Sequence, residues 1–414
     1  MEPGAQPRSR TFIAVLAALL TFGALFAVSA DAFVVEKDIV YHSGAEGSPD
    51  LKKLDVYRPD DARRGDLRPV VVYVHGGAWM NGDKSNRMEY KPDLFTSAGY
   101  VFVSVNYRLS PEVTSTDPDQ FDPGRLRFPE HPGDVAESIA WVSRNIGARG
   151  GDPDAIMLLG HSAGAHLVSL VATNPVYLDN RGASAEQVLG VVSLDAGALN
   201  VAESAIQAGA QPTVNNLLIW NAFGTPAENA LRGDWVDASP VNWADSSDPR
   251  HLLVTQADRL LRVHDNRLMA GALGQDPLGV FESPLDHEGI NTVLGDPVDT
   301  TGETAAVMGF IADRRAGRIN PAIAIRKRPA KKVRIGSRAK KRKVVFKFTA
   351  RGVAAGIQCR LDRAKFSRCS SPHSFRVKPG GHTFRLRSLY PSGRPGKVKV
   401  VKFKVVRNKR HHRR

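Results

Sequence analysis

Short runs of β-branched residues alternate with longer helical patterns from residue 33 to about residue 315. The runs RPVVVYVHGG (68–77) and YVFVSVNYRL (100–109) are apolar bursts, which are typical of strands buried on both faces. The segment DVAESIAWVSRNI (134–146) instead repeats its apolar residues at helical spacing. This regular alternation predicts an α/β fold with a mostly parallel central sheet flanked by helices.

The same alternation continues to the end of this region. We expect further strands at 155–160, 189–197, 251–258 and 278–284, and helices at 165–173, 263–273 and 301–315. Ligands of parallel sheets bind beyond the carboxyl ends of the strands. Residues with chemical roles should therefore follow the strands directly.

Ser162 lies in the segment MLLGHSAGAHLV (157–168), where Gly160 and Gly164 complete a G-x-S-x-G motif. The motif alone is weak in a chain with 37 glycines, and the alternative is an ordinary glycine-rich turn. A predicted strand before it and a predicted helix after it favour a nucleophile elbow, with Ser162 as the nucleophile. His161 and His166 lie in the same short segment as Ser162, so we expect them to pack or line a pocket rather than act as the base.

A second glycine motif, VHGGAW (74–79), follows the first buried strand. Glycines there expose backbone N–H groups, so Gly76 and Gly77, with the N–H of Ala163, are predicted to stabilise an oxyanion. The alternative is a plain strand-ending turn. Two such motifs in the expected order favour the oxyanion site.

A serine nucleophile needs a base and an orienting carboxylate, which follow it in the order acid then histidine in this kind of fold. Asp258 ends the expected strand 251–258 and is the predicted acid, with Asp195 as the alternative. His287, in SPLDHEGIN (283–291), is the predicted base, and the alternative for it is a surface histidine. His264 is too close to Asp258 in the chain to serve.

These segments resemble the α/β-hydrolase fold, and within it the esterases with an HGG-type oxyanion loop, most closely the feruloyl-esterase-like enzymes and kynurenine formamidases. The resemblance is carried by HGGAW (75–79), NYRLSP (106–111), FPEHPGDVAESIAWV (128–142), GGDPDAIMLLGHSAGAHL (150–167) and LDHEGIN (285–291). It implies a triad of Ser162, Asp258 and His287. The acid loop TQADRLL (255–261) departs from relatives that often have a glycine before the aspartate.

The resemblance implies hydrolysis of small carboxylic esters through an acyl-enzyme intermediate. The segment between Asp195 and Pro240 is too short for a large helical lid, which argues against a long-chain lipase. The alternatives are an arylformamidase or other acyl-amide hydrolase and, in a different class, an inactive binding protein. We expect no metal and no organic cofactor, since no ligand spacing in the sequence suggests one.

The charge of the chain is divided between two regions. The net charge is +15, from 57 Lys and Arg and 42 Asp and Glu. Residues 321–414 hold 31 of the basic residues and a single acid, Asp362, which leaves 26 basic and 41 acidic residues in positions 1–320. An acidic body of residues 33–318 is therefore predicted to precede a separate basic region.

The basic region begins with a Pro-, Lys- and Arg-rich stretch, residues 319–342, which we interpret as a linker. Alternating apolar residues then predict an antiparallel β-sandwich at 343–407, followed by a basic tail at 408–414. Cys359 and Cys369 are the only cysteines, and in an exported chain we expect them to form a disulfide.

The pattern C-x-LD…F-x-x-C-x-SP…HTF within 359–384 resembles immunoglobulin-like modules of exported bacterial proteins, although the outward lysines and arginines depart from them. Such charge suits an anionic cell-wall polymer or a membrane surface as partner. Specific nucleic-acid binding is not expected because no base-stacking aromatic pattern accompanies the charge. The alternative is a solvated basic face without a specific partner.

The first 30 residues have the pattern of a signal peptide. Arg8 and Arg10 precede the apolar stretch FIAVLAALLTFGALFAV, and small residues at VSA (28–30) and ADA (30–32) offer cleavage sites. The alternative is an uncleaved membrane anchor. In both cases the body is expected outside the cytoplasm, secreted or attached to the cell envelope.

Overall fold

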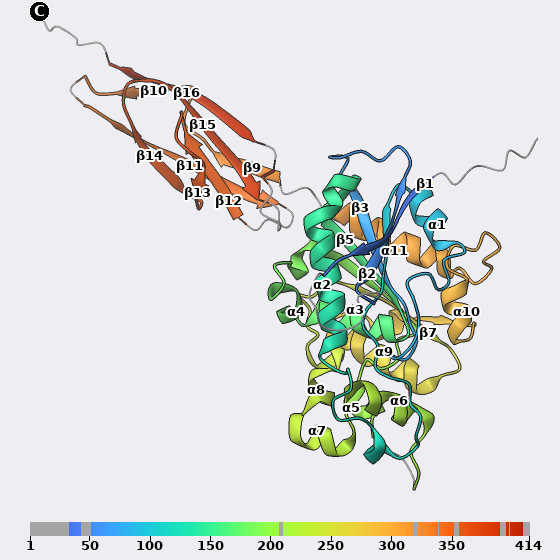
Figure 1. Ribbon diagram of the computed structural model, residues 1–414. Helices are drawn as coiled ribbons and strands as arrows, with labels where there is room; N and C mark the ends of the chain where they lie inside the picture. The colour runs from blue at the N-terminus through green and yellow to red at the C-terminus, as the bar shows by residue number, and fades with distance from the viewer. Residues whose placement is uncertain are drawn as a thin grey trace, which may run out of the picture. The chain divides into compact units, whose positions relative to one another are not determined.

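The computed structural model describes residues 33–42, 51–206, 210–317, 322–337, 339–351, 356–389, 395–396 and 398–408. Figure 1 shows a helix-flanked sheet formed by the first part of the chain and a separate all-β domain formed by the last part. The predicted signal peptide lies outside the described residues, as does nearly all of the predicted basic tail. Within the described ranges, no helix combines the length and the apolar character needed to cross a membrane.

The central sheet of the first domain has eight strands in the order β1-β2-β4-β3-β5-β6-β7-β8. The neighbours from β4 to β8 are parallel, whereas β1 and β2, and β2 and β4, are antiparallel. The predicted mostly parallel sheet is therefore confirmed. The strands are β1 (Phe33–Val40), β2 (Lys53–Pro59), β3 (Arg68–Val74), β4 (Val101–Val105), β5 (Gly151–His161), β6 (Val188–Leu194), β7 (His251–Gln256) and β8 (Phe281–Ser283).

Helices cover both faces of this sheet. Alternate residues of β3 enter different cores: Val72 packs with residues of α2 and α3, whereas Tyr73 packs with residues of α1, α10 and α11. Both faces of β3 are therefore buried, as its continuous apolar run predicts. The helices are α1 (Lys91–Ser97), α2 (Glu130–Asn145), α3 (Ala163–Thr173), α4 (Val176–Asp179), α9 (Leu260–Ala272), α10 (His287–Thr292) and α11 (Glu303–Gly317).

Among the described residues between β6 and β7 there are four short α-helices. Ser162 and Asp195 lie at the carboxyl ends of β5 and β6, on the edge of the sheet where parallel strands present their ligand sites. The short helices are α5 (Val201–Ser204), α6 (Val214–Phe223), α7 (Pro226–Arg232) and α8 (Asp234–Asp237).

The C-terminal domain has a five-stranded sheet, β10-β16-β15-β12-β13, and a three-stranded sheet, β14-β11-β9 (Figure 1). Residues of both sheets share one hydrophobic core, in which Phe346 stacks on Phe384 at 3.9 Å between ring centroids. Cys359 and Cys369 form the expected disulfide, with Cα atoms 6.0 Å apart. The strands are β9 (Ala322–Lys327), β10 (Lys332–Ile335), β11 (Arg342–Arg351), β12 (Gly356–Leu361), β13 (Ser367–Arg368), β14 (His373–Val377), β15 (Gly380–Leu389) and β16 (Lys399–Arg407).

The prediction of a linker at 319–342 is wrong at 322–327 and 332–335, where the chain forms β9 and β10. β9 pairs with β11, and β10 pairs in parallel with β16. Ile323 and Ile335 are buried in the shared core, so these two short strands belong to the C-terminal domain. Their apolar residues are too few to form a visible period among the lysines and arginines. β9 and β10 are held in place by pairing with β11 and β16, and only the tertiary structure shows these pairings.

Candidate functional site

Ser162 occupies the sharp turn between β5 and α3. Its backbone has a φ of 52° and a ψ of −117°, a strained combination for a residue with a side chain and the usual one for a nucleophile elbow. Gly164 allows this turn, because a Cβ there would collide with the backbone oxygens of Val74 and His75. The serine is 8% exposed, so its hydroxyl is accessible only from the site.

His287 lies where the chain leaves β8 and begins α10. Its Nε2 is 2.9 Å from Oγ of Ser162. Asp286 caps the helix by accepting the N–H of Gly289 at 2.7 Å, and Nε2 of His161 is 2.8 Å from the carbonyl oxygen of His287. The backbone of His287 is thus held from two sides, and the structure brings the predicted base and nucleophile together.

The carboxylate that contacts His287 is Asp195, so the prediction of Asp258 for this position is wrong. Oδ2 of Asp195 is 2.5 Å from Nδ1 of His287, while Oδ1 accepts Oγ1 of Thr255 and the N–H of Gln256, both at 3.1 Å. Asp258 is exposed in the turn before α9. β7 ends at Gln256, so Asp258 lies beyond the strand end, where the chain has already turned toward solvent.

Arg262, at the start of α9, is a site residue that the sequence did not indicate. Its Nη1 is 2.5 Å from Oδ2 of Asp195, 3.1 Å from the carbonyl oxygen of Asp195 and 3.0 Å from Nδ1 of His287. Burial alone raises the pKa of Asp195, but the hydrogen bond with His287 and the positive charge of Arg262 outweigh burial and lower it. Asp195 is therefore ionised and bridges the imidazole and the guanidinium.

The predicted oxyanion donors lie around Ser162. Ala163 is the first residue of α3, where the N-terminus of an eleven-residue helix favours negative charge. A Cβ added to Gly76 would lie 3.0 Å from Cβ of Ser162 and 2.9 Å from Nδ1 of His161, so the HGG backbone passes directly beside the nucleophile. The structure therefore brings Gly76 and Ala163 to Ser162, with Gly77 next in the chain.

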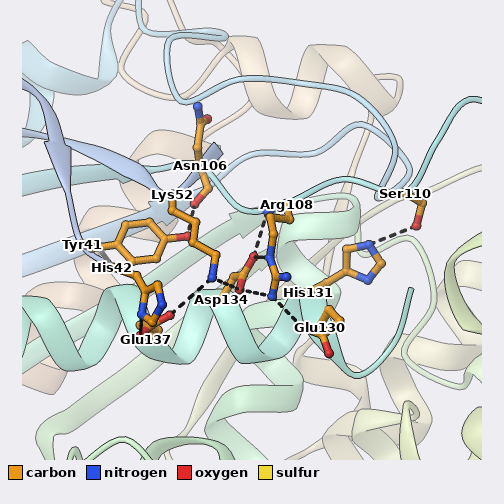
Figure 2. Close-up of polar contacts among 10 residues, drawn as sticks. All are labelled: Tyr41, His42, Lys52, Asn106, Arg108, Ser110, Glu130, His131, Asp134 and Glu137. Carbon is orange, nitrogen blue, oxygen red and sulfur yellow. Dashed lines mark hydrogen bonds and ion pairs between the residues drawn. The ribbon is translucent and has the colours of Figure 1, made fainter. Parts of the chain in front are cut away.

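A buried network of ion pairs and hydrogen bonds supports the loop after β4 from α2 (Figure 2). Arg108 donates from Nε to Oδ2 of Asp134 at 2.7 Å and from Nη2 to Oδ1 at 2.8 Å, and Nζ of Lys52 is 3.7 Å from Oδ1. The hydroxyl of Tyr41 donates to the carbonyl oxygen of Asn106 at 2.9 Å. Arg108 of NYRLSP and Asp134 of FPEHPGDVAESIAWV thus hold the two segments against each other.

The loop after β4 also contacts the HGGAW segment (75–79). The N–H of Ser110 donates to the carbonyl oxygen of Trp79 at 2.8 Å, and the hydroxyl of Ser110 is 3.1 Å from Nε2 of His131. The indole N–H of Trp79 in turn contacts Nδ1 of His166 at 3.3 Å. Burial lowers the pKa of His166 to about 4 and that of His161 to about 3, so both rings are neutral at pH 7. Their roles agree with the expected packing and lining.

A cavity of about 520 Å³ opens beside the HGG segment and His161. Its lining is largely polar and includes Asn81, Ser85 and Arg87, and Arg87 pairs with Glu288 at 3.4 Å. Ser162 itself does not line this cavity, which reaches the site through Gly76, Gly77 and His161.

His161, His287 and Glu288 form a cluster whose potential metal-ligand atoms lie within 4.8 Å of one another. Both ring nitrogens of His287 already have partners, Ser162 and Asp195, and Nε2 of His161 contacts the backbone of His287. Loading this cluster with a metal would break the contacts that hold His287 in place, so the donor set does not fit a resident ion.

The strand order and the serine, histidine and aspartate at the carboxyl edge of the sheet define a protein of the α/β-hydrolase fold. The family model BD-FAE matches residues 54–273, and the chain belongs to this family. Esterase LipQ of Mycobacterium tuberculosis is 38% identical over 135 residues, which cover 33% of this chain and 28% of LipQ. Carboxylesterase 3B of Mus musculus is 34% identical over 132 residues, 31% of this chain and 22% of that protein.

These curated relatives are each matched over less than a third of their length. Among solved structures, a truncated carbohydrate esterase from gut microbiota has a TM-score of 0.51 at 18% identity and covers 69% of this chain and 98% of its own. Esterase B from Lactobacillus rhamnosis has a TM-score of 0.51 at 19% identity, covering 69% of this chain and 89% of its own. At such identities these structures show the fold alone.

Proposed function

We propose that residues 33–317 form a serine hydrolase that cleaves carboxylic esters, with Ser162, His287 and Asp195 as its catalytic triad. The observation that carries the proposal is the continuous chain of contacts from Oγ of Ser162 through both nitrogens of His287 to Oδ2 of Asp195. The esterases and carboxylesterases among its relatives support the same reaction.

In this mechanism Nε2 of His287 takes the proton of Ser162 as Oγ attacks the ester carbonyl. Asp195 accepts a hydrogen bond from Nδ1 and stabilises the imidazolium that forms. The N–H groups of Gly76, Gly77 and Ala163 stabilise the oxyanion of the tetrahedral intermediate. The alcohol leaves with the proton from His287, and water, activated by the same histidine, hydrolyses the acyl-serine.

We infer that the alcohol part of the substrate is small and polar. The cavity beside the HGG segment is lined by polar side chains, among them Asn81, Ser85 and Arg87, which can form hydrogen bonds with a polar group but not with an apolar one. We expect kcat/KM to be higher for glycerol monobutyrate than for the hexyl ester of the same acid. A preference for the hexyl ester would contradict this inference without affecting the triad.

Replacement of Ser162 tests the reaction itself. Ser162→Ala should lower kcat for p-nitrophenyl butyrate by about 1,000-fold or more. A fluorophosphonate probe should label the wild-type chain on the peptide that contains Ser162. The matched control is Ser97→Ala, an exposed serine on α1, which should leave the rate unchanged. Equal rates for wild type and Ser162→Ala would remove the proposal.

We also propose that residues 1–30 direct export of the protein and that the C-terminal domain is immunoglobulin-like. The basic n-region, the apolar stretch and the small residues at 28–32 support export, and the two antiparallel-rich sheets around one core support the domain assignment. N-terminal sequencing of the protein from a secreting host checks the first point. Cytoplasmic retention with an intact N-terminus would contradict it.

A further inference from the structure

One face of the five-stranded sheet in the C-terminal domain is cationic. Along β16, Val401, Phe403 and Val405 are buried in the core, whereas the intervening Lys402 and Lys404 are exposed. The same alternation continues on β15, where Phe384 and Leu386 are buried and Arg385 and Arg387 point to the other face. The register of the strands places Lys332 and Arg360 on that face too, on β10 and β12.

Like charges lie directly opposite each other across the strands of this face. Lys332 pairs in register with Lys404, and Arg360 pairs with Arg385. Directly opposed like charges destabilise a sheet. Asp362 is the only acid in residues 321–414, and its carboxylate already accepts the N–H of Thr383 and contacts His382. The charge of Asp362 also acts on Arg385, whose Nη1 donates to the carbonyl oxygen of Asp362 at 3.4 Å, so this single acid offsets only part of the charge of the face.

Two of the cations, Arg360 and Arg387, are held in position by neighbouring side chains. The guanidinium groups of Arg360 and Arg387 lie over the ring of Phe366, at 4.7 and 4.2 Å from its centroid. Arg387 is also fixed by two hydrogen bonds to Oε1 of Gln358. Nε of Arg360 is buried and has no hydrogen-bond partner among the described residues. An anion beside Arg360 would accept a hydrogen bond from its Nε and would bridge Arg360 and the opposed Arg385.

We propose that this cationic face binds a linear, flexible polymer of phosphodiester-linked polyol units. Neighbouring cations are spaced about 4.8 Å across the strands and about 6.8 Å along them, so an extended chain with repeated single charges can contact several at once. The inference is independent of the hydrolase activity, because it rests only on the C-terminal domain.

Nucleic acids and membranes fit the face less well. The ring of Phe366 is covered by two guanidinium groups, so in the described part of the face it is not free to stack on a base. No helix of this domain is described that would enter a major groove. Val400, 49% exposed, stands in register with Arg385, and Val398, 39% exposed, lies two residues before it. Two valines offer little apolar area for insertion into a bilayer.

Binding of the full chain to poly(glycerol phosphate), measured by fluorescence anisotropy at fixed ionic strength, tests the proposal. The test variant replaces three cations of the face: Arg360→Gln, Arg385→Gln and Lys404→Gln. Its matched control makes the same change of charge on the opposite sheet: Lys343→Gln, Lys347→Gln and Arg376→Gln. The affinity should fall about tenfold or more in the test variant and about threefold or less in the control, and the wild-type affinity should fall steeply with added salt.

Equal losses in the two variants would overturn the proposal, because binding would then follow net charge rather than this face. Tighter binding of the wild-type chain to oligo-dT, to duplex DNA or to phosphatidylglycerol vesicles at equal charge concentration would overturn the assigned partner. Folding is checked by thermal unfolding, where removal of opposed cations should leave the melting temperature of the test variant equal or higher. Should that variant fail to fold, Lys402→Gln with Lys404→Gln replaces it, with Lys343→Gln and Lys347→Gln as its control.

Discussion

Asp195 is completely buried, and its backbone φ of 45° aims a short side chain from the end of β6 toward His287. Both carboxylate oxygens are occupied, by Thr255 and Gln256 at Oδ1 and by His287 and Arg262 at Oδ2. A side chain fixed by this many partners holds the imidazole in one orientation and one tautomer. Asp258 has neither the burial nor the contacts for that role.

The two aspartates should therefore respond differently to the same substitution. Asp195→Asn should lower kcat on p-nitrophenyl butyrate by about 1,000- to 10,000-fold, because an amide favours the wrong tautomer of the imidazole. Asp258→Asn should change kcat by less than about twofold, since it removes an exposed carboxylate. Steady-state kinetics on both variants check this. A large loss in Asp258→Asn with activity kept in Asp195→Asn would restore the acid predicted from sequence.

Arg262 places a fixed positive charge beside the acid and the base of the site. Its charge is one of the causes that lower the pKa of Asp195. In Arg262→Met this charge is lost, so Asp195 should become protonated at higher pH and the acid limb of the kcat/KM profile should move to higher pH. Arg259→Met, at an exposed position one turn earlier, should leave the profile in place. An unchanged acid limb in Arg262→Met would show that the guanidinium has only a structural role.

At the scale of elements, α10 is a short helix whose position determines that of His287. Lys91 on α1 is 1% exposed and donates from Nζ to the carbonyl oxygens of Asn291 on α10, at 2.6 Å, and of Arg87, at 2.9 Å. The hydroxyl of Tyr73 on β3 donates to Oδ1 of Asn291 at 3.0 Å. Burial lowers the pKa of Lys91 to about 7, so the anchor is only partly charged at neutral pH.

Removal of this anchor should loosen α10. Lys91→Met removes the donor to the buried carbonyl oxygen of Asn291 and to the part-buried carbonyl oxygen of Arg87, which should lower the free energy of unfolding by about 1–3 kcal/mol. We expect kcat to fall severalfold as well, because His287 begins α10. Urea denaturation and kinetics on the same preparation check both effects. Lys37→Met, at an exposed position of β1, is the control and should change neither quantity.

At the scale of the whole molecule, the hydrolase domain buries several neutral histidines. Burial lowers their pKa values from 6.5 to about 3 or about 4. The unfolded chain therefore binds more protons than the folded chain as pH falls from about 6.5 toward 4, and stability is lost in that window. Glu303, whose pKa burial raises to about 8, and Asp265, whose pKa burial raises to about 6, oppose this trend but are fewer than the histidines. The histidines are His75, His131, His161, His166 and His251.

The urea concentration at the midpoint of unfolding of the hydrolase domain should thus decrease as the pH is lowered from about 7 to about 5. His251 lies away from the catalytic residues, at the start of β7, and its Nδ1 is 2.8 Å from the carbonyl oxygen of Pro249. His251→Asn keeps a donor near that position but does not titrate, so the fall in unfolding free energy should be shallower by up to about 1.4 kcal/mol per pH unit. A wild-type midpoint independent of pH across this window would contradict the prediction.

Much of the hydrolase fold was predictable because its central strands and longer helices each carry their own pattern. β3 and residues 155–160 of β5 are apolar runs, and α2 repeats apolar residues at helical spacing. β9 and β10 were missed because each carries few buried residues among many cations, and partners distant in the chain hold both strands. Arg262 gave no signal at all, since a single arginine on a helix has no distinctive pattern.

The sequence by itself determined the residues proposed as nucleophile and base, because Ser162 occupies a turn that only its glycine neighbours permit and His287 follows the last strand of the sheet. Only the tertiary structure decided which aspartate contacts His287. Asp195 and Asp258 both follow strands and both stand between the serine and the histidine in the chain, so order along the chain fits either. The choice between the two aspartates depends on where β6 and β7 end relative to His287 in space. No local sequence pattern encodes that distance.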